Sequence, residues 1–244
     1  MEIRDFKPGD EKAILELFNL VFKKPMSEKY WYWRFQDNPA GKHMIKLMWE
    51  ENQLVGHYAV SPVFMMVNEQ KVLTALSMST MTHPDFGGRG IFKDLSLSLY
   101  NLLENELEVK SIWGFPNANS HYGFIKNLNW KDITVMHTLT ANTDKWLHSK
   151  SEAIKIVADF SQYHAEILSN LTSKFKVKVD RNLDYLQWRY TKNPSNKYTI
   201  FEYNKDGNIQ FLVTKLYPSQ TKDGKQDIFI MEYGLSNHNL LPEF

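Results

Sequence analysis

A glycine-rich turn between a predicted strand and a predicted helix is the part of this sequence best suited to bind an anion. Residues 72–82 contain no glycine or proline and are rich in β-branched, apolar and small hydroxyl side chains, which predicts a strand. Pro84 ends it, residues 87–90 read Gly-Gly-Arg-Gly, and apolar residues then recur at helical spacing from Ile91. Free backbone amides and the positive end of the helix dipole would meet here, which favours a phosphate. A purely structural loop is the alternative.

The elements around this turn must position it. The pattern predicts strands over residues 2–6, 44–49, 54–67 and 72–82, and helices that begin near Asp10, Ser27 and Ile91. Pro62 marks a bulge or a sheet edge in the third of these strands. Beyond the turn we expect a strand at 111–115, a helix at 120–128, a strand at 131–139, a helix at 151–171 and a strand at 174–179.

The run HPDFGGRGIFKDL resembles the acyl-CoA-binding signature of the GNAT family of N-acyltransferases, which is Pro-x-aromatic, then Arg/Gln-x-x-Gly-x-Gly/Ala, then a helix. Pro84, Phe86 and Gly90 match it. Gly87 stands where the family usually has Arg or Gln, and Phe92 where it usually has Gly or Ala. The later GFPN…GF…LNW run resembles the second half of the GNAT core. The resemblance implies an α+β fold with a mixed, largely antiparallel sheet flanked by helices.

The resemblance also implies a CoA-type acyl donor, held mainly by backbone amides of the turn, and an amine acceptor. The residues that it places at the donor are Met81, Thr82, Gly87, Gly88, Arg89, Gly90, Ile91, Phe92 and Asn117. Acyl transfer from a thioester to an amine needs a base for the amine proton and an acid for the thiolate.

Two side chains are candidates for these proton transfers. Ile125 stands at the usual position of the acidic Tyr and cannot donate a proton, so Tyr122, three residues earlier on the same helix face, is the candidate acid. His83, at the end of the central strand, is the candidate base. A helix cap at Asn117, a packing role for Tyr122 and a solvent-facing His83 are the structural alternatives.

An internal repeat divides the chain. The run Trp33-Arg34-Phe35-Gln36-Asp37-Asn38-Pro39 is matched at an offset of 155 residues by Trp188-Arg189-Tyr190-Thr191-Lys192-Asn193-Pro194, and a hairpin turn follows in both copies. We therefore expect two GNAT-like lobes, residues 1–145 and 146–244, the second of them partial. The recurrence of Trp-Arg favours packing, with Arg stacked on an aromatic ring. The second copy has no Gly-Gly-Arg-Gly turn, so we expect one CoA site, in the first lobe.

Composition excludes several classes of function. The 244 residues contain no cysteine, which removes a disulfide scaffold and a thiol nucleophile and fits a reducing, cytoplasmic location. A formal net charge of +1 gives no support for nucleic-acid binding. No apolar run approaches the roughly 18 residues of a membrane span, and the histidines show no metal spacing.

The sequence therefore predicts an N-acyltransferase, an acetyltransferase that uses acetyl-CoA. Its acceptor is expected to be a small amine, an amino sugar or a peptide amine, and the sequence does not choose among these. One alternative is a non-catalytic GNAT-like module that binds CoA or a partner, which the changes at Gly87 and Ile125 would suit. Another is a tandem-lobe transferase that uses aminoacyl-tRNA, which would require a basic surface.

Overall fold

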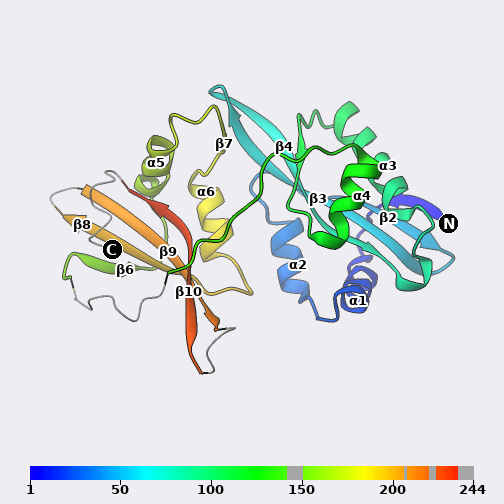
Figure 1. The fold of residues 1–244 in the computed structure, drawn as a ribbon, viewed down its shortest axis with the longest axis horizontal. Coiled ribbons are helices and arrows are strands. Elements are labelled where there is room, and N and C mark those ends of the chain that lie inside the picture. Colours follow the sequence, from blue (N-terminus) through cyan, green and yellow to red (C-terminus); the bar gives the residue numbers. More distant parts are fainter. Residues whose placement is uncertain (142–150, 206–207, 220–223, 236–244) are drawn as a thin grey trace.

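Two α+β halves lie side by side in the computed structural model, which describes residues 1–141, 151–205, 208–219 and 224–235 (Figure 1). Alternating apolar residues build one antiparallel-dominated sheet in each half, and helices cover the sheets. The expected α+β fold, with largely antiparallel sheets flanked by helices, is confirmed.

The N-terminal sheet has the order β1-β2-β3-β4-β5. Its strands are β1 (Glu2–Asp5), β2 (Met44–Glu50), β3 (Gln53–Val67), β4 (Gln70–Thr82) and β5 (Ile112–Trp113). Neighbouring strands are antiparallel except β4 and β5, which are parallel. One side of β3 pairs first with β2, as far as Val60, and then with β7 (Val177–Val179), from Met65 onward. Pro62 lies between these two stretches, where no described strand pairs with that side of β3. The predicted edge at Pro62 is therefore confirmed.

Two pairs of helices cover the two faces of this sheet. One face packs on α1 (Glu11–Phe22) and α2 (Glu28–Phe35) around a core that includes Trp31 and Leu47. The other packs on α3 (Ile91–Asn105) and α4 (Ala118–Leu128) around Tyr58 and Leu99. Gly56 lets α3 approach β3 closely, because a Cβ at this position would lie 2.4 Å from the Ile91 side chain. The sheet therefore separates an α1/α2 face from an α3/α4 face.

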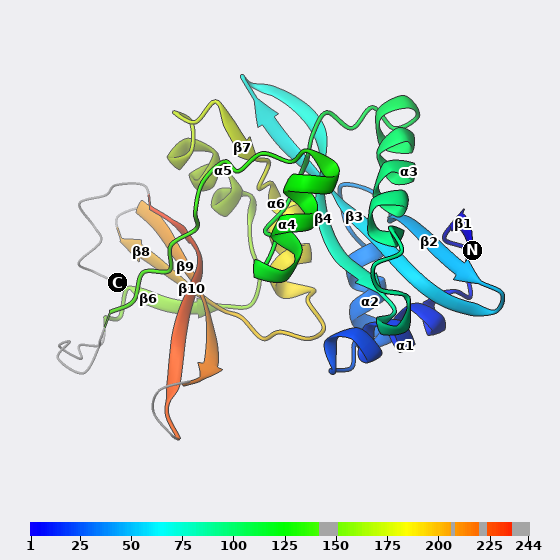
Figure 2. The ribbon, with the colours of Figure 1, turned by 45° about the vertical axis from the view of Figure 1, so that its right-hand side comes forward.

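The C-terminal sheet has the order β10-β9-β8-β6. Its strands are β6 (Ile154–Val157), β8 (Thr199–Lys205), β9 (Asn208–Pro218) and β10 (Gln226–Gly234), and its helices are α5 (Gln162–Leu171), α6 (Leu183–Leu186) and the π-helical turn η2 (Gln187–Thr191). Figure 2 shows the segment after α4 crossing from the N-terminal to the C-terminal half.

The two halves repeat the same order of elements at the predicted offset. β8 begins and ends 155 residues after β2, and α6 with η2 follows α2 at the same distance. The helix caps repeat as well: Ser27 accepts a hydrogen bond from the Tyr30 amide, and Asn182 accepts one from the Tyr185 amide. The sequence repeat is thus a structural repeat. The domain boundary near residue 145 stays a prediction. β7 comes after this boundary in the sequence but pairs with β3 of the N-terminal sheet.

Two predicted elements are wrong. Residues 131–139 form no strand, although their apolar side chains alternate, and Ile133 and Leu139 are exposed. An alternating pattern predicts a strand only where a sheet edge is free to pair with it, and no described strand pairs with this segment. The helix expected over 151–171 is instead β6 followed by α5, because the edge of β8 offers β6 a partner. No helix in the described ranges is long and apolar enough to cross a membrane.

Candidate active site

The glycine turn leads from the end of β4 into α3. A short 3-10 turn, η1 (Pro84–Phe86), precedes it. Gly88 and Gly90 have φ angles of 76° and 81°, which favour glycine, and Gly90 is the N-cap of α3 without a side-chain cap. A Cβ at Gly88 would meet no atom within 4 Å, so the turn faces open space. The amides at the start of α3 are therefore presented to an incoming anion.

Charged side chains surround this turn. Arg89 and Lys93 are exposed, and the Arg89 guanidinium lies 4.6 Å from the centre of the Phe86 ring. Asp94, in the first turn of α3, places a carboxylate oxygen 3.8 Å from the position of a Cβ on Gly90. Arg89 and Lys93 thus add positive charge beside the turn, and the Asp94 carboxylate would oppose a bound diphosphate.

An open strand edge adjoins the turn. β5 pairs with β4 only at Ala75 and Leu76, so the rest of that edge, from Ser77 to Thr82, has no strand partner among the described residues. The parallel pair splays apart after two residues, which leaves unpaired backbone groups on the side of β4 that continues into the glycine turn. An extended molecule could hydrogen-bond to this edge as a further strand would.

β4 also contains a bulge on this open edge. His57 pairs with Met81 and Ala59 with Met78, so Ser79 and Thr80 together oppose Tyr58. Ser79 has a φ of 51°, uncommon for a residue with a side chain. The sequence pattern does not predict the bulge, because nothing between Leu76 and Thr82 signals a positive φ.

His57 holds the bulge from the α1/α2 face. Its Nδ1 lies 2.7 Å from the Ser79 carbonyl oxygen, so Nδ1 carries the proton and donates it. Burial lowers the pKa of His57 to about 4, and the ring is therefore neutral at physiological pH. Its Nε2 is buried without a hydrogen-bond partner among the described residues.

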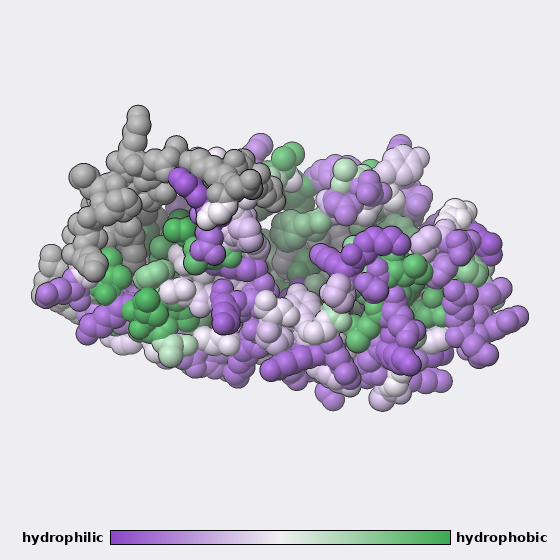
Figure 3. Space-filling model, turned by 90° about the horizontal axis from the view of Figure 1, so that it is seen from below, coloured by the Kyte–Doolittle hydropathy of each residue, from purple (hydrophilic) through white to green (hydrophobic). Residues whose placement is uncertain are grey.

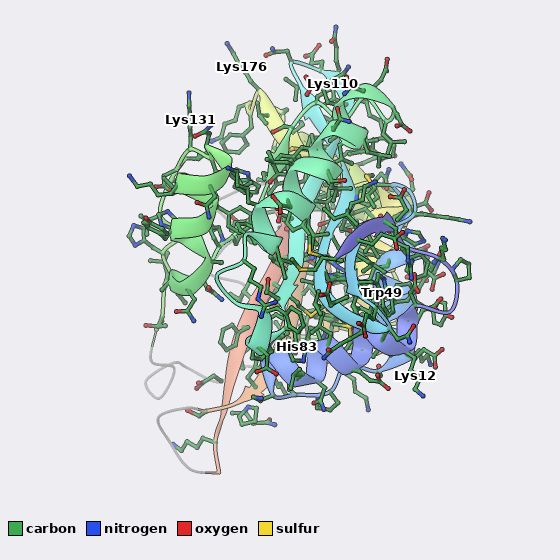
Figure 4. All side chains as sticks on the ribbon, turned by 90° about the vertical axis from the view of Figure 1, so that its right-hand side faces the viewer. Lys12, Trp49, His83, Lys110, Lys131 and Lys176 are labelled. Atoms are coloured by element: carbon green, nitrogen blue, oxygen red, sulfur yellow. The ribbon has the colours of Figure 1, made fainter. Side chains whose placement is uncertain are left out.

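His83 lies at the start of the turn, at the opposite end of the sheet from Lys110 (Figure 4). Its Nδ1 accepts a hydrogen bond from the Asp85 amide at 3.2 Å, and its Nε2 lies 3.1 Å from Gln53 Nε2. The ring meets Phe86 edge-on, with 5.5 Å between the ring centres. These contacts orient the imidazole within the turn, and its role as base stays a prediction.

Two candidate residues belong to α4. Asn117 caps α4: its side chain accepts hydrogen bonds from the Asn119 and Ser120 amides. The helix cap, which was the structural alternative to a cofactor contact for Asn117, is therefore present. Tyr122 is 68% exposed on α4, so its hydroxyl is accessible to a ligand as well as to water.

Phe92 and Met81 contribute differently from the glycines. The Phe92 ring packs against Phe124, with 5.1 Å between the ring centres, and lies 3.0 Å from the position of a Cβ on Gly123. It thereby bridges α3 and α4. Met81 is 2% exposed in the core below α1 and α2, so only its backbone can face the open edge. Thr82 and Ile91 flank the turn, with Ile91 buried as its anchor in the core.

No three histidine, aspartate or glutamate side chains gather as metal ligands within the described ranges. The arrangement is instead a glycine turn at a helix N-terminus, beside an open strand edge with a bulge. Hydrogen-bond donors that converge on the oxygen of a reacting carbonyl group stabilise the oxyanion that forms there.

Part of the sequence matches a known family of proteins. Residues 2–132 match the family model described as an acetyltransferase (GNAT) domain. No protein with curated annotation matches the sequence.

Three solved structures resemble nearly the whole chain. A protein from Enterococcus faecalis V583, described as a probable N-acyltransferase, is 13% identical with a TM-score of 0.70, over 98% of this chain and 60% of that chain. Saccharomyces cerevisiae N-myristoyltransferase with bound myristoyl-CoA is 11% identical with a TM-score of 0.61, over 96% and 65%. A GCN5-related N-acetyltransferase from Anabaena variabilis ATCC 29413 is 10% identical with a TM-score of 0.64, over 97% and 59%. These identities show a shared fold, and the chain spans less than two thirds of each of these proteins.

Proposed function

The chain belongs to the GNAT acetyltransferase family, and on this premise we propose that it is an acyl-CoA-dependent N-acyltransferase that acetylates a primary amine. The observation that carries the proposal is the uncapped start of α3 at Gly90, directly beside the open edge of β4. The diphosphate of CoA would bind the turn, and the thioester arm would lie along the strand edge. The structural likeness to N-myristoyltransferase with bound myristoyl-CoA supports an acyl-CoA donor.

The reaction would proceed by direct transfer. The neutral amine attacks the thioester carbonyl, a C–N bond forms, the C–S bond breaks, and the electron pair leaves with sulfur. The amine nitrogen gives up one proton, which His83 or water accepts, and the thiolate takes up one proton, which Tyr122 or water supplies. Backbone amides of the bulge at Ser79 and Thr80 would stabilise the charge on the carbonyl oxygen.

The acceptor would be a primary amine of a small molecule, an amino sugar or a peptide, and we place it on the α1/α2 side of β4. A cytoplasmic location remains part of this proposal, based on the absence of cysteine. A non-catalytic module would bind CoA at the same site but would not transfer the acyl group. Two measurements, one of binding and one of turnover, therefore distinguish it from an acyltransferase.

The first measurement is the melting temperature with and without acetyl-CoA. A ligand at ~100 times its dissociation constant stabilises the folded state by about 2.7 kcal/mol, which is readily visible. The second is release of free CoA thiol when a mixture of primary amines is added. An unchanged melting temperature at millimolar acetyl-CoA would refute the CoA site, and binding without thiol release would favour the non-catalytic module.

A further inference from the structure

A buried arginine lies between the two halves of the molecule. Arg34, in the last turn of α2, is 8% exposed. Its Nε donates to the Met78 thioether sulfur at 3.2 Å, its one side-chain hydrogen bond within the described residues. The guanidinium lies 5.4 Å from the centre of the Trp188 ring and 5.8 Å from that of Trp33. A thioether is a weak acceptor, so the described residues satisfy little of the hydrogen-bonding capacity of Arg34.

The second repeat places another arginine at the equivalent position. Arg189 is partly buried, and its guanidinium lies 5.5 Å from the centre of the Tyr190 ring. Burial lowers the pKa of Arg34, and the positive charge of Arg189 lowers it further. Both groups remain protonated at physiological pH, because an arginine pKa stays far above it.

These two positive charges lack a negative partner in the part of the chain that the structure describes. Every ion pair there involves other residues, and the titratable groups that act on Arg34 besides Arg189 are tyrosines, namely Tyr30, Tyr185 and Tyr198. Tyrosine is neutral at physiological pH and compensates no charge. A charge withdrawn from water without a counter-charge is costly, and buried charges in proteins are normally paired.

Packing alone does not account for Arg34. The Trp33 and Trp188 indoles already stack on each other and hydrogen-bond to each other's backbone, so neither ring depends on the guanidinium for a partner. A guanidinium presents two parallel N–H groups that match a carboxylate in both geometry and charge. The unused donors of Arg34 therefore suit a planar anion.

The position of Arg34 relates this anion to the acyl-transfer site. Met78, its hydrogen-bond partner, directly precedes the bulge at Ser79. Met78 packs on the α1/α2 face, the side where we place the amine acceptor. Figure 3 shows the surface hollowed between the two halves, with hydrophobic residues at the back of the hollow. A molecule bound beside Met78 would lie close to both the bulge and the arginine.

We propose that Arg34, assisted by Arg189, binds a carboxylate of the acceptor, so that the enzyme acylates an amine that also carries a carboxylate, such as an amino acid or a peptide near its C-terminus. This inference rests on the proposed acyl transfer for the identity of the ligand as acceptor. The carboxylate subsite itself is a property of the two arginines and is measurable without turnover.

The binding test compares two probes that differ only in the anionic group, N-acetylglycine and N-acetylglycinamide. At constant ionic strength, N-acetylglycine should raise the melting temperature of the full chain at a concentration at least tenfold lower than N-acetylglycinamide. Arg34→Gln should abolish this difference and keep the response to acetyl-CoA. Arg89→Gln, at the glycine turn, is the matched control and should keep the difference between the probes.

A second variant keeps the test decisive if Arg34→Gln does not fold. Arg189→Gln should weaken the N-acetylglycine response, because it removes one of the two charges that attract the carboxylate. Equal responses of the wild type to both probes would overturn the proposal, and so would a folded Arg34→Gln protein that still prefers N-acetylglycine.

The turnover test uses glycine and glycinamide as acceptors. The kcat/KM for glycine divided by that for glycinamide should be at least tenfold lower in Arg34→Gln than in the wild type. Comparing this ratio between the two proteins cancels the intrinsic reactivity of each amine. Acetylation of both amines with an unchanged ratio would overturn the carboxylate subsite and leave the proposed acyltransferase standing. Absence of turnover with every amine would refute the acyltransferase, and the probe titrations would still decide the subsite.

Discussion

Trp33 and Trp188 occupy equivalent positions in the two repeats and make the same contact with each other in both directions. Trp33 Nε1 donates to the Trp188 carbonyl oxygen at 2.7 Å, and Trp188 Nε1 donates to the Trp33 carbonyl oxygen at 2.9 Å. The rings stack with 4.9 Å between their centres and 17° between their planes. Such reciprocity is the mark of a two-fold contact, found here within one chain. It joins α2 of one half to η2 of the other.

This contact predicts a strong energetic coupling between the two tryptophans. Trp33→Phe and Trp188→Phe should each destabilise the protein by about 2 kcal/mol, because each loses one buried hydrogen bond and part of the stacking. The double variant should be less destabilised than the sum by about 1 kcal/mol, because the stacking is lost only once. Chemical denaturation of the four proteins measures this coupling.

Trp113→Phe provides the control for this cycle. Trp113 donates one hydrogen bond to Thr74 Oγ1 at 3.1 Å, away from the contact between the halves. Its combination with Trp33→Phe should be additive. Additivity of Trp33→Phe with Trp188→Phe would contradict a shared contact.

The repeat that creates this contact could be predicted from the sequence. The matching Trp-Arg runs gave the correct offset, and their interpretation as packing is confirmed by the rings of Trp33 and Trp188 and by Arg34 above them. The repeat was visible in the residue types, because equivalent helices that are buried in the same way keep the same side chains. The glycine turn could be predicted for a similar reason: the positive φ angles of Gly88 and Gly90 favour glycine itself.

Features that depend on distant partners could not be predicted. The positive φ of Ser79 is fixed by the register of β3 against β4 and by the hydrogen bond from His57, and neither is visible in a local pattern. The alternation in residues 131–139 predicted a strand whose partner edge is not present among the described strands. The Trp-Arg run predicted packing for Arg34, whereas its lack of a carboxylate partner among the described residues could be seen only in the structure.

The glycine turn predicts that Gly90→Glu abolishes the stabilisation by acetyl-CoA. The variant places bulk and negative charge at the uncapped start of α3, where the diphosphate would bind. Gly90→Ala is the matched control, because it suffers the same backbone strain of about 1 kcal/mol at a φ of 81° without adding a charge. We expect Gly90→Ala to retain a response to acetyl-CoA in the thermal melt. An equal response of both variants and the wild type would place the site elsewhere.

Asp94 predicts a change in the opposite direction. Its carboxylate lies beside the start of α3 and would repel a diphosphate, so Asp94→Asn should tighten acetyl-CoA binding roughly two- to fivefold, as expected for one charge near a helix N-terminus. Calorimetric titration measures the dissociation constant. High salt should reduce the gain, because salt screens exposed charges. Weaker binding in Asp94→Asn would show that the carboxylate assists the ligand instead.

The exposed hydroxyl of Tyr122 allows a clean test of its proposed role as acid. Tyr122→Phe should lower kcat ~100-fold with little change in the dissociation constant for acetyl-CoA, because only a proton donor is removed. Its stability should stay within about 0.5 kcal/mol of the wild type, since the side chain is 68% exposed. Tyr163→Phe, exposed on α5 of the other half, is the control and should leave kcat unchanged. Undiminished turnover in Tyr122→Phe would leave water as the proton source.

The buried His57 predicts that stability falls as the pH is lowered from about 6.5 to about 4. Burial lowers the pKa of His57 from 6.5 to about 4 in the folded protein, so the unfolded chain binds more protons in this window. Protonation therefore favours the unfolded state, by roughly 3 kcal/mol at most when the full shift is expressed. Burial also lowers the pKa of His43 and of His164, which act in the same direction.

His57→Leu should consequently show a shallower loss of stability with acid, although at neutral pH it loses the hydrogen bond to the Ser79 carbonyl, worth about 1 kcal/mol. Urea denaturation at several pH values between 4 and 7 gives the free energy of unfolding for each protein. His137→Gln, at an exposed position, controls for removal of a histidine as such. The same dependence on pH in wild type and His57→Leu would mean that burial of the neutral His57 ring does not cause the loss of stability in acid.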